Sequence, residues 1–402
     1  MKPTTVAVAV TLAVQTLTSM AMIAPSVLAP VAARDLGVAP QAIGLFASVT
    51  YFAAMLSGLM TGRLMARFGP LALCQAAVVL AGLGLAAGKL GVAAAVLVAA
   101  AAIGFAYGLV NPVSSHLLAR FTPPRVMSLV FSIKQTGVPL GGAIAGAAVP
   151  ALVLALGWRD TLVALGAACI GGAVLLLPAR RTVSEQPAAG SAFARSLRGV
   201  FTGLGRPIQL VLADRALRDL AWTSFGYAAV QLVFITYFVS YLNLELGYSL
   251  VTAGLVYAFA HGSGIVGRIA WGVVADRWLA PRATLALLGA ISAACALLSA
   301  AFSAAWPLAA VVAVAVVFGA SAVGWNGVFL AEVARCAPAG QVSAATGGTL
   351  FFTYAGAVLG PPLFAALVFA TGSYGWTFAL FAIPTAAAAV RVAGGAPARA
   401  GA

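Results

Sequence analysis

The chain has few charged residues. Only 7% of its 402 residues are Asp, Glu, Lys or Arg, whereas roughly 25% is usual for a soluble globular protein. Hydrophobic residues make up 63%, and the mean hydropathy is +1.07. This composition excludes a water-soluble domain built around one core, because too few polar side chains are present to cover its surface.

Residues that carry enzyme chemistry are also scarce. The chain has two histidines, eight acids and four cysteines, and the cysteines show neither a CxxC pair nor metal-ligand spacing. An enzyme would need clustered nucleophile, base or metal ligands, and a sensor would normally carry a soluble output domain. We therefore predict no catalytic residue, no metal and no cofactor, and a membrane-embedded enzyme or sensor remains only as an alternative of a different class.

Long apolar runs are plentiful. Thr5–Val31, Ile43–Gly62 and Leu71–Gly88 each reach the roughly 20 residues that a helix needs to cross a bilayer. They lack the alternation of a transmembrane β-barrel and are rich in small residues that let helices pack in lipid. We predict an all-α membrane protein with twelve spans, near residues 5–31, 41–62, 71–88, 92–117, 127–153, 161–178, 219–241, 251–275, 284–303, 307–331, 344–369 and 376–391.

The distribution of the 22 Lys and Arg residues predicts the topology. With these spans, seventeen lie on one side of the membrane and only Arg34, Lys89 and Arg159 lie on the other. The positive-inside rule then places both termini in the cytoplasm and the protein in the inner membrane. The net charge of +14 thus reflects orientation in the bilayer, and we predict no nucleic-acid partner.

One long polar stretch, residues 179–218, divides the chain. It carries seven arginines and separates six predicted spans from six others. We predict a first six-helix bundle at 1–178, a cytoplasmic linker at 179–218 and a second six-helix bundle at 219–402.

The two predicted bundles repeat each other. Asn111 and Asn326 are 215 positions apart, as are Gly104 and Gly319. The runs GVPLG from Gly137 and GAVLG from Gly356 are 219 apart. Such internal duplication is typical of transporters whose halves rock about a central site, so the sequence predicts two pseudo-symmetric bundles.

A loop signature follows the second and eighth spans. It reads Gly62, Arg67 and Gly69 in the first copy, with Ala66 before the arginine, and Gly272, Asp276 and Arg277 in the second copy, with Leu279 at the last glycine position. Over essentially its whole length the chain resembles the major facilitator superfamily, in which this loop carries an acid that helps to close the cytoplasmic side. The missing acid at position 66 puts that role in doubt for the first copy. From this resemblance we predict gating roles for Gly62, Arg67, Gly69, Gly272, Asp276, Arg277, Gly137, Pro139, Gly141, Gly356, Gly360 and Pro361.

Two cations fall inside predicted spans. Arg268 lies eight residues before Asp276, which is about 12 Å at 1.5 Å per residue, and Lys134 lies at a similar depth. A cation there costs about 2.5 kcal/mol or more, so it usually faces a cavity and has a function. All eight acids fall at span ends or in loops, which favours an anionic ligand over a structural role for each cation. The segment from Arg268 to Gly272 is similar to one in the monocarboxylate and oxalate/formate carriers, where the arginine binds the substrate carboxylate, and cyanate carriers are an equally similar group.

We predict a monomeric secondary transporter of a small organic anion, most simply a carboxylate, with protons as a coupling ion. In the fold that the resemblance implies, Lys134 and Arg268 could converge on one site. The alternative within the same superfamily is an efflux antiporter of drugs or cations, which the absence of an acid within the spans disfavours. The predicted substrate-binding residues are Lys134, Arg268, His261, Asn111, Asn326, Gln231, Tyr107 and Tyr227.

Overall fold

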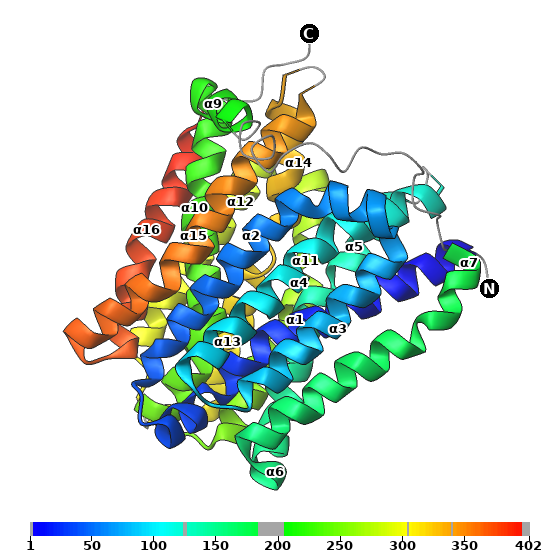
Figure 1. Cartoon of the computed structure of the whole chain (residues 1–402). Coiled ribbons are helices and arrows are strands. Elements are labelled where there is room, and N and C mark those ends of the chain that lie inside the picture. The colour runs from blue at the N-terminus through cyan, green and yellow to red at the C-terminus, as the bar shows by residue number, and fades with distance from the viewer. Residues whose placement is uncertain (1–2, 124–126, 184–204, 304, 339–340, 396–402) are drawn as a thin grey trace. The chain divides into compact units, whose positions relative to one another are not determined.

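A computed structural model describes residues 3–123, 127–183, 205–303, 305–338 and 341–395. Every regular element in these residues is a helix (Figure 1). The chain divides into two compact units, Met1–Ser196 and Leu197–Ala402. The dividing point falls inside the predicted linker, of which residues 184–204 lie outside the described residues. The boundaries at 178 and 218 remain predictions.

The first unit contains long apolar helices joined by short connections (Figure 1). Its described elements are α1 (Pro3–Leu36), η1 (Pro40–Ala42), α2 (Ile43–Phe68), α3 (Pro70–Gly88), α4 (Ala93–Phe121), α5 (Met127–Gln135), α6 (Gly137–Leu175), η3 (Leu177–Ala179) and α7 (Arg180–Val183).

The second unit has the same construction and adds one short π-helix, η4. Its described elements are α9 (Gly205–Ala213), α10 (Arg215–Ser240), η4 (Tyr241–Glu245), α11 (Leu250–Arg277), α12 (Pro281–Ala300), α13 (Leu308–Ala322), α14 (Asn326–Cys336), α15 (Val342–Thr371) and α16 (Tyr374–Gly394).

Eleven stretches of the described chain are long and apolar enough to cross a membrane. One of them, Val130–Val183, has 54 residues, well over twice the roughly 20 residues that a single crossing needs. Within it Gly157 has φ 78° and ψ 163°, a conformation outside the helical region, and two helices meet there. This stretch therefore supplies two spans, which gives six spans in each unit. The predicted fold class, an all-α membrane protein with twelve spans in two bundles, is confirmed.

Two spans that the sequence analysis treats as continuous are interrupted. In the fifth span, α5 ends at Gln135 and α6 begins at Gly137. Proline has no N–H, so Pro139 leaves the carbonyl of Gln135 without its partner four residues later, and this accounts for the interruption. In the tenth span, turn residues Val323–Trp325 separate α13 from α14.

The sequence repeat reappears as a repeat of helix contacts. A side-chain carbon on Gly104 of α4 would lie 2.0 Å from the carbonyl oxygen of Thr50 on α2, and one on Gly319 of α13 would lie 2.0 Å from that of Ala260 on α11. Thr50 and Ala260 are themselves 210 positions apart. Corresponding glycines thus mark the closest approach of corresponding helix pairs, which is how small residues allow helices to pack in lipid.

The predicted gating glycines of the fifth and eleventh spans follow the same rule. A side-chain carbon on Gly141 would lie 2.6 Å from the carbonyl oxygen of Thr16, so α6 packs directly on α1. One on Gly360 of α15 would lie 2.9 Å from the Cα of Ala229 on α10. Within each unit these residues therefore have a packing role, whether or not they also take part in gating.

A methyl group at these crossings should destabilise its own unit. We expect Gly104→Ala and Gly319→Ala each to cost about 1–3 kcal/mol, since the helices must separate to admit the methyl group. Gly171→Ala is the matched control, because nothing lies within 4 Å of that position, and it should unfold at or slightly above the wild-type temperature. The measurement is the apparent thermal unfolding temperature of purified protein in detergent. Equal temperatures for Gly104→Ala and Gly171→Ala would contradict the packing role.

Candidate functional site

Lys134 is the most deeply buried cation among the described side chains of the first unit. It lies in the last turn of α5, just before the interruption at Thr136, and is 1% exposed. Its ammonium group donates hydrogen bonds to Oδ1 of Asn111 on α4 and, at 3.4 Å, to Oε1 of Gln135. Two predicted substrate-binding residues, Lys134 and Asn111, are thus in direct contact.

Further polar side chains of the first unit lie on the neighbouring helices. Gln15 on α1 packs against the start of α6, since a side-chain carbon on Gly137 would lie 2.9 Å from Cβ of Gln15. Its amide nitrogen donates to Oγ of Ser19 at 3.5 Å, while its amide oxygen is buried and accepts no hydrogen bond from the described residues. Tyr107, one turn before Asn111, contacts the ring of Tyr51 edge-on, with the centroids 6.1 Å apart.

Arg268 of the second unit lies beside the interrupted tenth span. Its Nε donates to the carbonyl of Val323 at 3.1 Å, and Trp271, one turn further along α11, donates to the carbonyl of Ala320 at 3.1 Å. Carbonyls at the end of a helix lack intrahelical partners and carry the negative end of the helix dipole. Arg268 therefore has a structural contact within the second unit, in addition to any role in binding.

His261 lies two turns before Arg268 on α11 and is fully buried. Its ring packs against that of Tyr257 with the centroids 4.4 Å apart, and the Tyr257 hydroxyl donates to the carbonyl of Ile235 at 3.1 Å. Neither ring nitrogen of His261 has a hydrogen-bond partner among the described residues. One ring nitrogen of a neutral imidazole can donate a hydrogen bond and the other can accept one, so both remain available for a ligand.

The remaining predicted residues of the second unit meet at Trp325. Gln231 accepts a hydrogen bond from the Trp325 indole at 3.0 Å, and the ring of Tyr227 lies edge-on to it at 5.6 Å. The Tyr227 hydroxyl also donates to the carbonyl of Leu285 at 2.7 Å. Asn326 is the first residue of α14, directly after Trp325, and is partly buried. Sequence reasoning missed Trp325, although its position beside Asn326 is the one signal that could have indicated it.

The two copies of the loop signature differ in structure. In the first copy Gly69 has φ 78° and joins α2 to α3, which requires glycine, and Arg67 is exposed, with its guanidinium 5.2 Å from the ring centre of Phe68. In the second copy Asp276 and Arg277 lie in the last turn of α11, where Asp276 is partly exposed and Arg277 is exposed. The carboxylate of Asp276 makes no hydrogen bond or ion pair with the described residues of the second unit. Its role in closing the cytoplasmic side remains a prediction.

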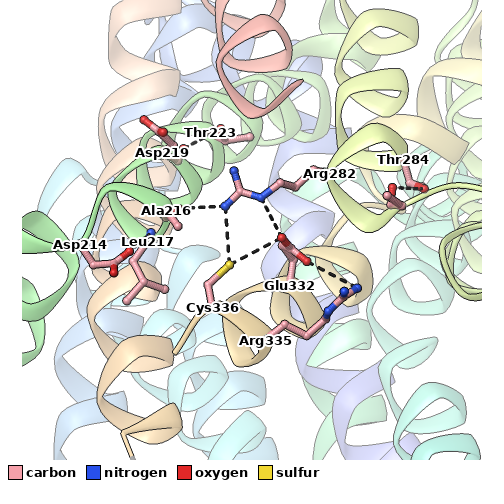
Figure 2. Close-up of polar contacts among 11 residues, drawn as sticks. Asp214, Ala216, Leu217, Asp219, Thr223, Arg282, Thr284, Glu332, Arg335 and Cys336 are labelled. Carbon is pink, nitrogen blue, oxygen red and sulfur yellow. Dashed lines mark hydrogen bonds and ion pairs between the residues drawn. The ribbon is translucent and has the colours of Figure 1, made fainter. Parts of the chain in front are cut away.

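A polar network that the sequence did not indicate joins several helix ends of the second unit (Figure 2). Nε of Arg282 donates to Oε1 of Glu332 at 2.8 Å, and Nη2 of Arg282 lies 3.5 Å from the carbonyl of Ala216 and 3.6 Å from Sγ of Cys336. The Glu332 side chain is only 3% exposed, and Arg335 approaches its other oxygen to 3.9 Å. The network connects α10, α12 and α14. Glu332 stands three residues before Arg335, which is a weak sequence signal for an ion pair.

No group of three or more His, Cys, Asp or Glu side chains that could hold a metal ion occurs in the described residues. The described acids other than Asp276 instead have other contacts. Asp35 pairs with Arg159, Asp160 with Lys89, Asp219 with Arg391 and Glu332 with Arg282. Asp214 accepts a hydrogen bond from the backbone N–H of Leu217 at the start of α10, and Glu245 accepts two from the first residues of α16.

Solved structures show similar folds. The chain aligns over 97% of its length with 95% of a bacterial homologue of the human lysosomal transporter Spinster in an inward-facing, unoccupied conformation, with a TM-score of 0.70 and 15% identity. The occupied form of a bacterial Spinster homologue gives a TM-score of 0.68 at 13% identity, over 96% of this chain and 94% of that one. At these identities the likeness shows the fold alone.

Two relatives are similar in sequence, and both are named as transporters. The hexuronate transporter of Bacillus subtilis is 26% identical over 174 residues, which cover 43% of this chain and 40% of the relative. The protein named "Probable sulfoacetate transporter SauU" of Cupriavidus necator is 26% identical over 265 residues, which cover 63% of this chain and 60% of the relative. The matched parts thus span less than two thirds of either relative.

The model of the Major Facilitator Superfamily matches residues 11–347, most of the chain. Family and relatives alike are transporters rather than enzymes. The chain is a multi-pass membrane protein that belongs to the Major Facilitator Superfamily.

Proposed function

We propose that this protein is a secondary transporter of a small organic anion, and that Lys134 and Arg268 bind the anion. The observation that carries the proposal is Lys134 itself: a fully buried lysine within a membrane span, held by the amide oxygens of Asn111 and Gln135. Placing a cation in a span costs about 2.5 kcal/mol or more. Such a residue is usually retained for a ligand, and an anion is the ligand that its charge favours.

Three further features support an anion. The described acids pair with cations, accept hydrogen bonds at helix ends or, like Asp276, lie in the last turn of a helix, so none of the described carboxylates lies unpaired in the middle of a span, where a cationic drug could bind it. Arg268 has a planar guanidinium that can hold a carboxylate or sulfonate by two parallel hydrogen bonds. The two relatives carry names of anion transporters, for hexuronate and sulfoacetate. We therefore favour a carboxylate or sulfonate of that size over a cationic drug.

Amide and phenol groups lie on the helices that contact α5, the helix of Lys134, in the first unit. Asn111 contacts Lys134 directly, Gln15 packs at the start of α6, and Tyr107 lies one turn before Asn111. Amides and phenols both donate and accept hydrogen bonds, so they suit an anion that carries hydroxyl groups. We propose a proton or a second anion as the coupling species, and His261 as one group able to carry the proton.

Replacing the cations should weaken anion uptake. We expect Lys134→Ala and Arg268→Ala to reduce affinity about thirtyfold to a thousandfold, because a charge-assisted contact in a partly desolvated site is worth ~2–4 kcal/mol. Arg268→Lys should also lower the affinity, because lysine lacks the planar guanidinium that makes two parallel hydrogen bonds. Lys134→Arg should lower the affinity less. The measurement is counterflow of labelled glucuronate and sulfoacetate in proteoliposomes, with glucose as the neutral comparison and a cationic dye as the test of the alternative.

The control is Arg215→Ala, which removes an exposed cation at the start of α10 and should transport as the wild type does. Thermal unfolding of each variant, with and without the anion, separates binding from structure. A structural Arg268 would lower the unfolding temperature equally in both conditions. Wild-type uptake in both alanine variants, each folded and inserted, would contradict the anion site.

We also propose an inner-membrane location with both termini in the cytoplasm, on the basis of the seventeen-to-three division of Lys and Arg. A C-terminal alkaline phosphatase fusion should then be inactive, because that enzyme matures only outside the cytoplasm, while a C-terminal green fluorescent protein should be bright. An active phosphatase fusion would mean that the number of spans is odd or that the orientation is reversed.

The Arg282–Glu332 pair should contribute more to stability than the exposed pairs do. Breaking a buried ion pair by removing one partner costs about 3–5 kcal/mol, whereas an exposed pair is worth ~0–1 kcal/mol. We expect Glu332→Gln to unfold several degrees below the wild type, and Lys89→Gln, which breaks the half-exposed pair with Asp160, to unfold close to it. The double change Arg282→Met with Glu332→Leu should recover much of the loss. Equal unfolding temperatures for the two single variants would show that the buried pair contributes no more to stability than the exposed pair does.

A further inference from the structure

An apolar pocket lies within the first unit, apart from the cations proposed to bind the anion. Its volume is about 130 Å³, and it is lined by α1, η1, the start of α2, the end of α3, the start of α4 and the middle of α6. Every residue that lines it is apolar, including Leu28, Leu85, Ile103 and Leu162. Alanine and glycine positions on α1, α3 and α4 leave the space between the larger side chains.

The chemistry of the lining restricts the ligand. Apolar cavities of about 150 Å³ remain dry and bind molecules such as benzene, so a pocket of this kind takes roughly six carbon atoms of a chain or ring. The ring of Trp158 lines the pocket, while its indole N–H donates to Oδ2 of Asp35 at 2.9 Å. The polar end of that tryptophan is thus already bonded to a carboxylate.

Cations gather beside the pocket. Arg159 follows Trp158 and pairs with Asp35 at 2.6 Å, and Lys89 follows the lining residue Gly88 and pairs with Asp160 at 2.9 Å. A side-chain carbon on Gly91 would lie 3.0 Å from lining residue Leu36 and 3.2 Å from Nη2 of Arg159, so the guanidinium and the apolar wall share one border.

The local charge is positive. Arg34, in the last turn of α1, is exposed and has no acid partner among the described residues. Three cations and two acids give a local net charge of +1. Arg34, Lys89 and Arg159 are also the three cations that the sequence assigns to the side opposite the seventeen. Each described pair is about half exposed, so the ammonium and guanidinium groups keep hydrogen-bond donors directed at solvent or headgroups.

We propose that this pocket binds one acyl chain of an anionic phospholipid, whose phosphate lies among Lys89, Arg159 and Arg34. The acyl chain gains little free energy by moving from the bilayer into the pocket, because lipid tails are as apolar as the pocket. Selectivity therefore comes from the headgroup, and one uncompensated cation near a membrane surface favours an anionic lipid about fivefold. The proposal is independent of the transported substrate.

The test uses the whole protein in phosphatidylcholine vesicles with a trace of phosphatidylglycerol that bears a photoactivatable diazirine midway along one chain. After irradiation, adducts are mapped by mass spectrometry. We expect adducts on peptides that contain Leu85 and Leu162, and unlabelled phosphatidylglycerol should compete about fivefold better than phosphatidylcholine. Arg34→Gln should reduce that preference to about one.

Filling the pocket provides the matched pair of variants. Ala29→Phe places a ring in the pocket and should lower labelling of these peptides about fivefold or more. Ala94→Phe on α4 is the control, because Ala94 is exposed and does not line the pocket, and its labelling should equal that of the wild type. Ala32→Leu replaces Ala29→Phe if that variant does not fold. Undiminished labelling in a folded filled variant, or equal competition by the two lipids, would overturn the proposal.

Discussion

Backbone-to-backbone contact between pairs of helices is the interaction on which the rest of each unit depends. In the first unit α4 meets α2 at Gly104, and in the second α13 meets α11 at Gly319. In lipid, helices gain nothing by hiding apolar surface from each other, so they associate through close packing and hydrogen bonds. Asn111 lies two turns after Gly104 on α4. Arg268 directly follows Gly267 on α11, where an added side-chain carbon would lie 2.5 Å from the carbonyl oxygen of Ala320 on α13. These crossings therefore set the positions of the candidate binding residues.

The polar interior of each unit is mostly satisfied from within. Lys134 bonds to Asn111, Arg268 to a carbonyl at the broken tenth span, and Gln231 to Trp325. Buried polar groups that make no hydrogen bond cost free energy, so the exceptions carry information. The ring of His261 and the amide oxygen of Gln15 are buried groups without a partner among the described residues. Each of the two marks one place, among several in its unit, where the protein retains hydrogen-bonding capacity that its own fold does not use.

The fold can be predicted from the sequence because the features that determine it are local and periodic. Span length, the division of Lys and Arg, and repeated glycines are each visible in a single chain, and residues such as Gly104 and Gly319 have the packing role that their repetition implies. The interruptions at Thr136 and Val323–Trp325 were harder to predict. The first follows from Pro139, but Pro139 lies in a glycine-rich run that helix packing alone explains as well as gating does. The second depends on tertiary contacts from Arg268 and Trp271.

The candidate site was only partly predictable. Lys134 and Asn111 were both singled out, but nothing in their spacing showed that they touch. Trp325 and the pair of Arg282 with Glu332 were missed, because an aromatic or an arginine near a span end has many ordinary roles. Their partners lie 94 and 50 positions away in the chain, and sequence periodicity does not report such distant pairs.

The turn at Gly157 has a consequence for how this chain can vary. The fifth and sixth spans meet at a single residue, with no loop to absorb a change in length. Each residue added to or removed from a helix rotates the remainder of that helix by about 100°. Gly166 packs closely on α3, since a side-chain carbon added to it would lie 2.6 Å from the carbonyl oxygen of Gly82. One residue inserted at Gly157 would turn Gly166 away from this contact. The length of this hairpin is thus fixed by the helical repeat itself, and epitope tags or reporter domains belong elsewhere.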